Sequence, residues 1–317
     1  MARRPSRSRG SRSGGPWLFL LGLLVGAGVL FLYLHRSSPL SSLSAGSEEA
    51  PASPRRTPSR ETKRPSPRDI VASDHVEPTP VKLTPVPVSS GPVHGARVAV
   101  VIDDLGTSPD ELRPLEELGV PVTYSVLPYA EQTPQVVSEL RGRNAEILLH
   151  LPMQPKNGEN PGPGALLERM TDDELRQGTV AALKAVPGAV GVNNHMGSLL
   201  SSEEGPMNTV LEVIAERHLF FLDSRTSADS VGYKVATQLG IPAAERQVFL
   251  DGDPAPEAIR AQFQRLLALA RTHGAAIAIG HPHPETLAML ASEVPKAKAE
   301  GYEFVPVSYL LTRAGGE

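Results

Sequence analysis

The chain has 317 residues, of which 40% are hydrophobic, and a formal net charge of -4. So small a net charge provides no field for binding a polyanion, which argues against a nucleic-acid partner. The absence of cysteine excludes disulfides, thiolate nucleophiles and thiolate zinc sites, and leaves His, Asp and Glu as the strong metal ligands.

The N-terminal segment carries the pattern of a membrane anchor. Residues 1–16 form a basic tail, and residues 17–34 form an uncharged apolar run that spans about 27 Å at 1.5 Å per residue. Because arginines precede this run, we predict an uncleaved anchor whose N-terminus stays in the cytoplasm while the rest of the chain is exported. A cleaved signal peptide is the alternative, although its apolar core is usually about 7–15 residues long.

The next segment, residues 35–95, is rich in Pro, Ser, Thr and charged residues. So few apolar side chains cannot offset the entropy of ordering the backbone, and the composition predicts a disordered linker. Residues 96–317 then have the length and composition of one globular domain.

Within this domain, short apolar runs alternate with amphipathic stretches. Capping boxes at Ser108 and Thr171, and a proline at position 284, predict helix starts between the runs. Repeated strand-helix units of this length indicate a parallel α/β fold, here a distorted barrel of seven or eight (β/α) units. The strand candidates are Val98–Ile102, Val122–Val126, Glu146–Leu149, Ala189–Val192, Leu219–Leu222, Val248–Leu250, Ala275–Ile279 and Glu303–Val307.

Two adjacent acids, Asp103 and Asp104, directly follow the first strand candidate. Acids after a buried apolar run are costly unless they are paired or bind a metal. At a strand end, one carboxylate can bind a cation while its neighbour handles a proton. The alternative is an Asp pair that caps the following turn.

Two histidines also stand at predicted strand ends. His150 ends the run EILLH, and His195 lies in VNNHMGS. The C-terminal ends of parallel strands meet at one rim of a barrel. We therefore expect Asp104, His150 and His195 to form a carboxylate and two-imidazole set that suits zinc or another divalent metal and leaves positions open for water and substrate.

The last strands supply further candidates. His281 ends the run AAIAIG and is the better placed histidine of the sequence His-Pro-His, which also contains His283. Asp223, in FFLDSRT, can hold a catalytic imidazole in one tautomer, or it can instead be neutralised by Arg225. Substrate contacts are expected from Asn194, whose amide suits sugar hydroxyls, and from Arg225 and His283.

Five motifs in order, VVIDDLG, LLHLPM, GVNNHMGS, FLDSRT and GHPHPET, resemble the divergent polysaccharide deacetylase family of the NodB-related deacetylase barrels. The resemblance implies that Asp103 is the catalytic base, Asp104 a metal ligand and His150 the first histidine of an HxxxH motif. It also places His281 near the general acid and Asp223 in a supporting motif. Gln154 stands where the second metal histidine of that motif is expected, so His195 would have to complete the metal set.

The resemblance implies a metal-dependent hydrolase that removes acetyl groups from an N-acetylated or O-acetylated envelope glycan, peptidoglycan included. The setting would be the periplasmic side of the inner membrane. The alternative is a catalytically degenerate barrel that binds glycan or protein in the cell envelope. A glycosidase would need two carboxylates across a cleft, where this sequence offers histidines.

Overall fold

The structure is a computed structural model that describes residues 95–312. The predicted basic tail, the predicted anchor at residues 17–34 and nearly all of the predicted linker lie outside this range. Among residues 95–312, no helix is both long enough and apolar enough to cross a bilayer.

The described domain contains one curled sheet in which every strand pairing is parallel. The strand order is β6-β5-β4-β3-β2-β1-β8-β7, and β9 pairs with the start of β1. The strands are β1 (Arg97–Leu105), β2 (Thr123–Val126), β3 (Glu146–Met153), β4 (Gly191–Met196), β5 (Phe220–Asp223), β6 (Ala243–Glu245), β7 (Val248–Phe249), β8 (Ala275–Gly280) and β9 (Glu303–Phe304).

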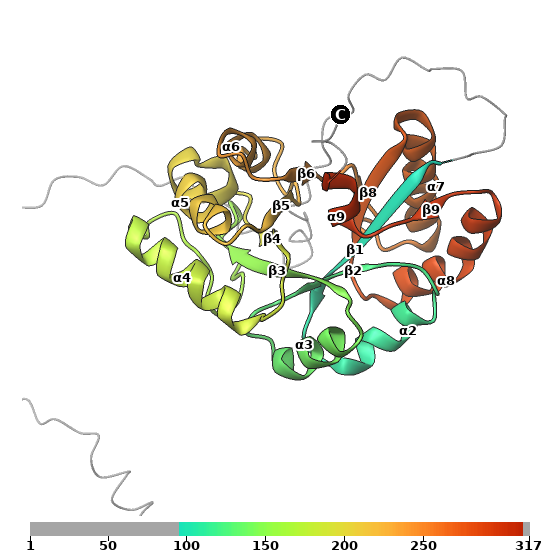
Figure 1. The fold of residues 1–317 in the computed structure, drawn as a ribbon, viewed down its shortest axis with the longest axis horizontal. Helices are drawn as coiled ribbons and strands as arrows, with labels where there is room; N and C mark the ends of the chain where they lie inside the picture. Colours follow the sequence, from blue (N-terminus) through green and yellow to red (C-terminus); the bar gives the residue numbers. More distant parts are fainter. Residues whose placement is uncertain (1–94, 313–317) are drawn as a thin grey trace, which may run out of the picture. The chain divides into compact units, whose positions relative to one another are not determined.

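Helices follow most strands, and all but the last of them surround the outer side of the sheet (Figure 1). They are α2 (Leu112–Glu116), α3 (Thr133–Gly142), α4 (Asp172–Ala185), α5 (Glu204–Ala215), α6 (Gly232–Gln238), α7 (Pro256–His273), α8 (Pro284–Ala299) and α9 (Val307–Thr312), with 3-10 turns at Pro109–Glu111 and Leu200–Ser202. The capping box at Thr171 is confirmed at the start of α4. Ser108 caps a 3-10 turn instead, because Glu111 accepts a hydrogen bond from the backbone of Gly106.

A short segment connects the two edges of the sheet. β6 pairs with β5 and β7 pairs with β8, and only Arg246 and Gln247 separate β6 from β7. Their backbone N–H groups donate to the carbonyls of Asp223 and Ile277, both at 3.0 Å. The predicted parallel α/β architecture is therefore confirmed, in the form of a curled sheet. The strand β6 was not predicted, because its sequence, AAE, has no pattern typical of a strand.

Alternating side chains of the strands pack on the two faces of the sheet. Val98 and Val100 belong to the large core between sheet and helices, whereas Ala99 and Val101 belong to a smaller cluster on the inner face. Helix α9 adds Val307 to this inner cluster. Because the start of α9 is bonded to the first residues of β2 and β3, α9 covers the N-terminal end of the sheet and leaves the C-terminal end for a site.

Candidate active site

An irregularity in β1 brings the two adjacent acids to the same place. The pairing of β1 with β2 shifts register between Ile102 and Leu105, and Asp104 has a φ of 60°. A bulge of this kind re-aims a side chain, and a non-glycine residue at positive φ is strained unless its surroundings hold it there. As a result, Asp103 and Asp104 both lie near the imidazole of His150, although neighbours in a regular strand point in opposite directions.

The two histidines come from neighbouring strands in register. β3 and β4 remain paired beyond their predicted ends, with His150 opposite Asn193 and Pro152 opposite His195. Both histidines therefore lie within strands, where the ladder sets their backbone position. Only 2% of the His150 side chain and 18% of the His195 side chain are exposed.

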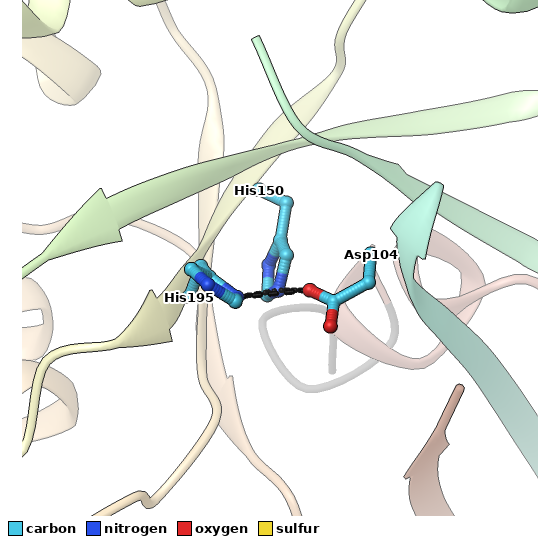
Figure 2. Close-up of side chains that lie close together, drawn as sticks. All are labelled: Asp104, His150 and His195. Atoms are coloured by element: carbon cyan, nitrogen blue, oxygen red, sulfur yellow. Dashed lines mark hydrogen bonds and ion pairs between the residues drawn. The ribbon is translucent and has the colours of Figure 1, made fainter. Parts of the chain in front are cut away.

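Asp104, His150 and His195 converge on one point, as Figure 2 shows. Asp104 Oδ1 lies 3.1 Å from His150 Nε2 and 2.9 Å from His195 Nδ1, and the two imidazole nitrogens are 3.2 Å apart. Asp104 Oδ1 is buried and receives no hydrogen bond of regular geometry from the described residues. Burial acts to raise the pKa of Asp104, but the two imidazoles outweigh it and hold the pKa well below its usual range.

This triangle fits a divalent metal. Zinc bonds of about 2.0–2.1 Å in tetrahedral geometry place the ligand atoms about 3.3 Å from one another, close to the distances among Asp104, His150 and His195. An oxygen and two imidazole nitrogens also form a donor set that zinc prefers. Burying a charged oxygen without a partner is costly. A bound divalent ion would supply that partner to Asp104 Oδ1.

Asn193 sets the orientation of His150. The amide nitrogen of Asn193 donates to Asp103 Oδ1 at 2.8 Å, so its oxygen faces His150 Nδ1 at 3.0 Å and Ser125 Oγ at 2.6 Å. Since an amide oxygen can only accept, Nδ1 carries the proton and Nε2 offers its lone pair to the site.

A second part of the site lies just after β7 and β8. His281 Nδ1 lies 3.0 Å from Asp251 Oδ1, and Asp251 Oδ2 accepts hydrogen bonds from the backbone N–H of His281 and from Thr286 Oγ1. His281 Nε2 is 3.8 Å from Asp104 Oδ2. Burial acts to lower the pKa of His281, but the hydrogen bond and charge of Asp251 raise it to about 9.

The carboxylate that supports His281 is therefore Asp251, which corrects the expectation for Asp223. The side chain of Asp223 accepts hydrogen bonds from Ser230 Oγ and the Tyr233 backbone. Its position in β5 explains this placement, because Phe220 and Leu222 occupy the inner face and the next residue points outward. Asp251 follows the apolar run Val248–Leu250 as Asp103 follows its own run, and this repeated pattern could have revealed it.

The expected substrate residues differ in their surroundings. Asn194 is 1% exposed, and its amide bonds Met196 O, Thr226 Oγ1 and the Ser224 backbone. Its amide thus braces two rim loops, and its expected contact with substrate stays a prediction.

Arg225 also stabilises the loop that follows β5. Its guanidinium pairs with Glu245 at 3.2 Å and donates to the carbonyls of Ser230 and Ala228. Its backbone N–H, rather than its guanidinium, donates to Asp223 Oδ1 at 2.8 Å, and its expected role toward substrate stays a prediction. His283 does remain at the rim, exposed, with its ring centre 5.5 Å from that of His281.

Gln154, four residues beyond His150, is not part of the metal-ligand triangle. Its side-chain oxygen accepts a hydrogen bond from the Glu168 backbone at 2.8 Å. His195, and not Gln154, therefore lies beside Asp104 and His150.

One buried arginine beside the site, Arg246, was not predicted from the sequence. Arg246 is 6% exposed, donates to the carbonyls of Ser224 and Arg225, and stacks on Phe249 with 4.7 Å between guanidinium carbon and ring centre. Burial lowers its pKa to about 10, against the charges of Asp103 and Asp223. Arg246 therefore places a positive charge near the carboxylates of Asp103 and Asp223.

A second group of possible metal ligands, Asp251, His281 and His283, lies beside the first. In this group Asp251 and His281 already bond each other, which favours a proton-handling pair over a second metal site.

Comparison with known proteins identifies relatives of the whole described domain. A family model described as divergent polysaccharide deacetylase matches residues 100–311. The uncharacterized protein YibQ of Escherichia coli (strain K12) is 35% identical over 205 residues, which cover 65% of this chain and 64% of YibQ. The chain thus spans somewhat less than two thirds of the length of that relative.

Two further relatives have no stated function. An uncharacterized protein of Haemophilus influenzae is 34% identical over 195 residues, covering 62% of this chain and 70% of that protein. The crystal structure of an uncharacterized protein from Agrobacterium tumefaciens C58 matches with a TM-score of 0.64 and 28% identity, covering 69% of this chain and 91% of that chain. The fold is therefore one that an experimental structure of a related sequence shares.

Proposed function

Because the chain belongs to the divergent polysaccharide deacetylase family, as its motif order predicted, we propose that it is a metal-dependent deacetylase of an acetylated envelope glycan. The observation that carries this proposal is the convergence of a metal-ligand triangle, a buried acid and a protonated histidine at one rim of the sheet. A glycosidase is less well supported, because the further rim carboxylate, Asp251, already bonds His281 and Thr286 and is not free to act as a second catalytic acid.

Asp104, His150 and His195 would hold the divalent ion, which in our proposal is zinc. When bound, such an ion supplies Lewis acidity toward the acetyl carbonyl and favours ionisation of water. Asn193 keeps His150 in the tautomer that binding requires.

Asp103 is the proposed general base. It is 3% exposed, and while its Oδ1 accepts the hydrogen bond from Asn193, its Oδ2 lies 3.5 Å from His150 Nε2 and faces the site. Oδ2 can therefore accept the proton that the attacking water loses as its oxygen bonds to the acetyl carbon.

His281 is the proposed general acid. With a pKa of about 9, it is protonated at neutral pH, and Asp251 fixes Nδ1 so that Nε2 faces Asp104. Nε2 can donate its proton to the nitrogen that leaves when the amide C–N bond breaks, which yields acetate and a free amino sugar. From an O-acetyl ester, the same steps release acetate and an alcohol.

We further propose that the enzyme acts on the periplasmic side of the inner membrane, with peptidoglycan-type glycan as substrate and the apolar run at residues 17–34 as its anchor. The arginines before that run support this orientation. A protease-protection assay on membrane vesicles tests it, since the C-terminal domain should be digested only from the periplasmic side.

Metal content and acetate release test the proposal on the full-length chain. We expect about one zinc-like ion per chain, lost in Asp104→Ala and in His195→Ala, and acetate release from N-acetylated glycans that both variants abolish. Asp110→Ala and His273→Ala are the matched controls, because both residues are exposed and belong to neither group of possible metal ligands.

Two results would contradict the proposal in different ways. No bound metal after incubation with zinc would rule out the metal-dependent mechanism. Bound metal without acetate release from any acetylated glycan would favour the alternative, a glycan- or protein-binding module.

A further inference from the structure

A pocket of about 210 Å³ opens beside the metal-ligand triangle. Its walls come from the segment after β2, which includes Tyr129 and Ala130, from Pro152 at the end of β3, and from Pro161 and Pro163 in the connection to α4. His195 belongs to its lining as well. The pocket and the ligand set therefore share a residue, so a group held in the pocket lies next to the proposed reacting centre.

The shape of the pocket is preformed. Prolines restrict the backbone on two of its walls, since the ring fixes φ. Gly164, with a φ of 74°, lies so close under Tyr129 that a Cβ there would come within 2.1 Å of the aromatic ring. Tyr129 is thus held against the loop that carries Pro161 and Pro163 while 39% of its surface stays exposed.

The chemistry of the walls favours an apolar ligand group. Among the residues that line the pocket, none is an acid, a lysine or an arginine, and Asn160, Tyr129 and His195 carry the polar side-chain atoms. The oxygen of Asn160 already accepts a hydrogen bond from Gly162. A sugar ring buried here would leave several hydroxyls short of partners, which is costly, whereas hydrocarbon gains by leaving water.

The size of the pocket exceeds what an acetyl group needs. An engineered cavity of about 150 Å³ holds a benzene molecule, and this pocket is larger, at about 210 Å³. The methyl of an acetyl group would leave most of it unfilled.

We infer that this pocket binds the acyl chain of the group to be hydrolysed, and that the substrates include amino sugars whose acyl group has about four to six carbons. The inference rests on the proposed deacylase function, but the binding preference of the pocket can be measured without turnover.

The first experiment measures binding to the full-length, metal-free chain by calorimetry, with acetamide, butanamide and hexanamide as probes. Each added methylene that enters the pocket should tighten binding about fourfold, from about 0.8 kcal/mol per buried CH₂. Ala130→Leu should abolish this dependence because it fills the pocket. Val190→Leu is the matched control, since Val190 is an exposed apolar residue that does not line the pocket.

Tyr129→Ala provides a second variant in case Ala130→Leu does not fold. It removes one wall and should reduce the gain per methylene, while the metal ligands stay unchanged. Binding that is independent of chain length, or a chain-length gain that persists in both variants, would overturn the inference.

The second experiment compares hydrolysis of N-acetyl-, N-butyryl- and N-hexanoyl-glucosamine by the zinc-loaded chain. We expect kcat/KM to rise at least tenfold from acetyl to butyryl. If amides bind with the expected dependence but nothing is hydrolysed, the pocket assignment stands and the proposed function fails. If N-acetyl sugar is hydrolysed and longer chains give no gain in either experiment, the proposed function stands and the acyl pocket does not.

Saturation-transfer NMR on N-butyryl-glucosamine distinguishes the two portions of the ligand. Transfer to the acyl protons supports the inference, whereas transfer confined to the sugar-ring protons would overturn it in favour of a sugar-binding pocket.

Discussion

The inner face of the sheet has two layers that differ completely in chemistry although the same strands build both. Residues of the lower layer are apolar and belong to the cluster that α9 covers, whereas side chains two residues further along each strand form the site. The lower layer includes Val101, Leu148 and Ile279, and the upper layer includes Asp103, His150 and His281. A spacing of two residues keeps both layers on one face, so one strand geometry positions a core and a reactive site.

The difference between the layers lies in what compensates burial. Leu148 gains stability by leaving water. His150 is as deeply buried, yet it needs Asn193 and, in our proposal, a metal to satisfy its nitrogens. The lower layer should therefore determine stability and the upper layer function, and substitutions can separate the two.

Replacing His150 by leucine extends the lower layer upward and should have the largest effect. Metal affinity should fall at least a hundredfold, because one of three ligands is lost. The free energy of unfolding of the metal-free chain should also fall, because the substitution leaves the amide oxygen of Asn193 and the carboxylate of Asp104 without the imidazole that they contact. Metal analysis and denaturant unfolding on the same preparation check both, and an unchanged metal affinity would remove His150 from the ligand set.

Truncating the lower layer should affect stability alone. Leu148→Ala should lower the free energy of unfolding by about 2–5 kcal/mol and leave metal stoichiometry unchanged in the protein that remains folded. Val190→Ala, an exposed position in the connection before β4, serves as control and should change stability little. Loss of metal from folded Leu148→Ala would mean that the two layers are not independent.

Removing the support of a ligand should have a smaller effect than removing the ligand. Asn193→Ala removes the acceptor that keeps the proton of His150 on Nδ1, and it should weaken metal binding about 10- to 100-fold. Asn208→Ala removes an amide from α5 that bonds Glu212, and should leave the metal affinity unchanged. Competition with a chelator measures both variants, and equal affinities for them would remove Asn193 from the site.

The smallest expected effect concerns the pH dependence of stability. The pKa of His281 is raised to about 9 by Asp251, against burial, from an unfolded value of about 6.5. The contribution of this pair to stability is thus fully present below about pH 6.5 and is lost as pH rises through about 9. Unfolding of the metal-free chain at pH 6 and pH 10 should show this loss, and Asp251→Asn should diminish it. NMR titration of His281 in that variant should give a pKa closer to the ordinary value.

Much of the site could be anticipated because its residues stand at the ends of apolar runs. In a parallel sheet such ends meet at one rim, so Asp103, Asp104, His150, His195 and His281 could be selected from the sequence. Their side chains do lie at one rim in the structure.

The errors concern residues whose role depends on direction. Asp223 also ends an apolar run, but the alternation of β5 turns it toward the outer side of the sheet, where Ser230 bonds it. Asp251 also follows an apolar run, but the strand before it has only two residues, so the sequence does not show that its side chain reaches His281. Arg246 becomes a site residue only because the chain passes there from one edge of the sheet to the other.

By itself the sequence determined the parallel α/β architecture, the order of the motifs and the residue types available for metal binding, because strand length, hydrophobic pattern and side-chain chemistry are local properties. Tertiary structure alone decided that Asp104 turns back at a bulge to meet His150 and His195, and that Asp251, not Asp223, holds His281. These contacts depend on how strands that are distant along the chain pair and on which face each side chain points to. A shift of one residue in the register sends a side chain to the opposite face.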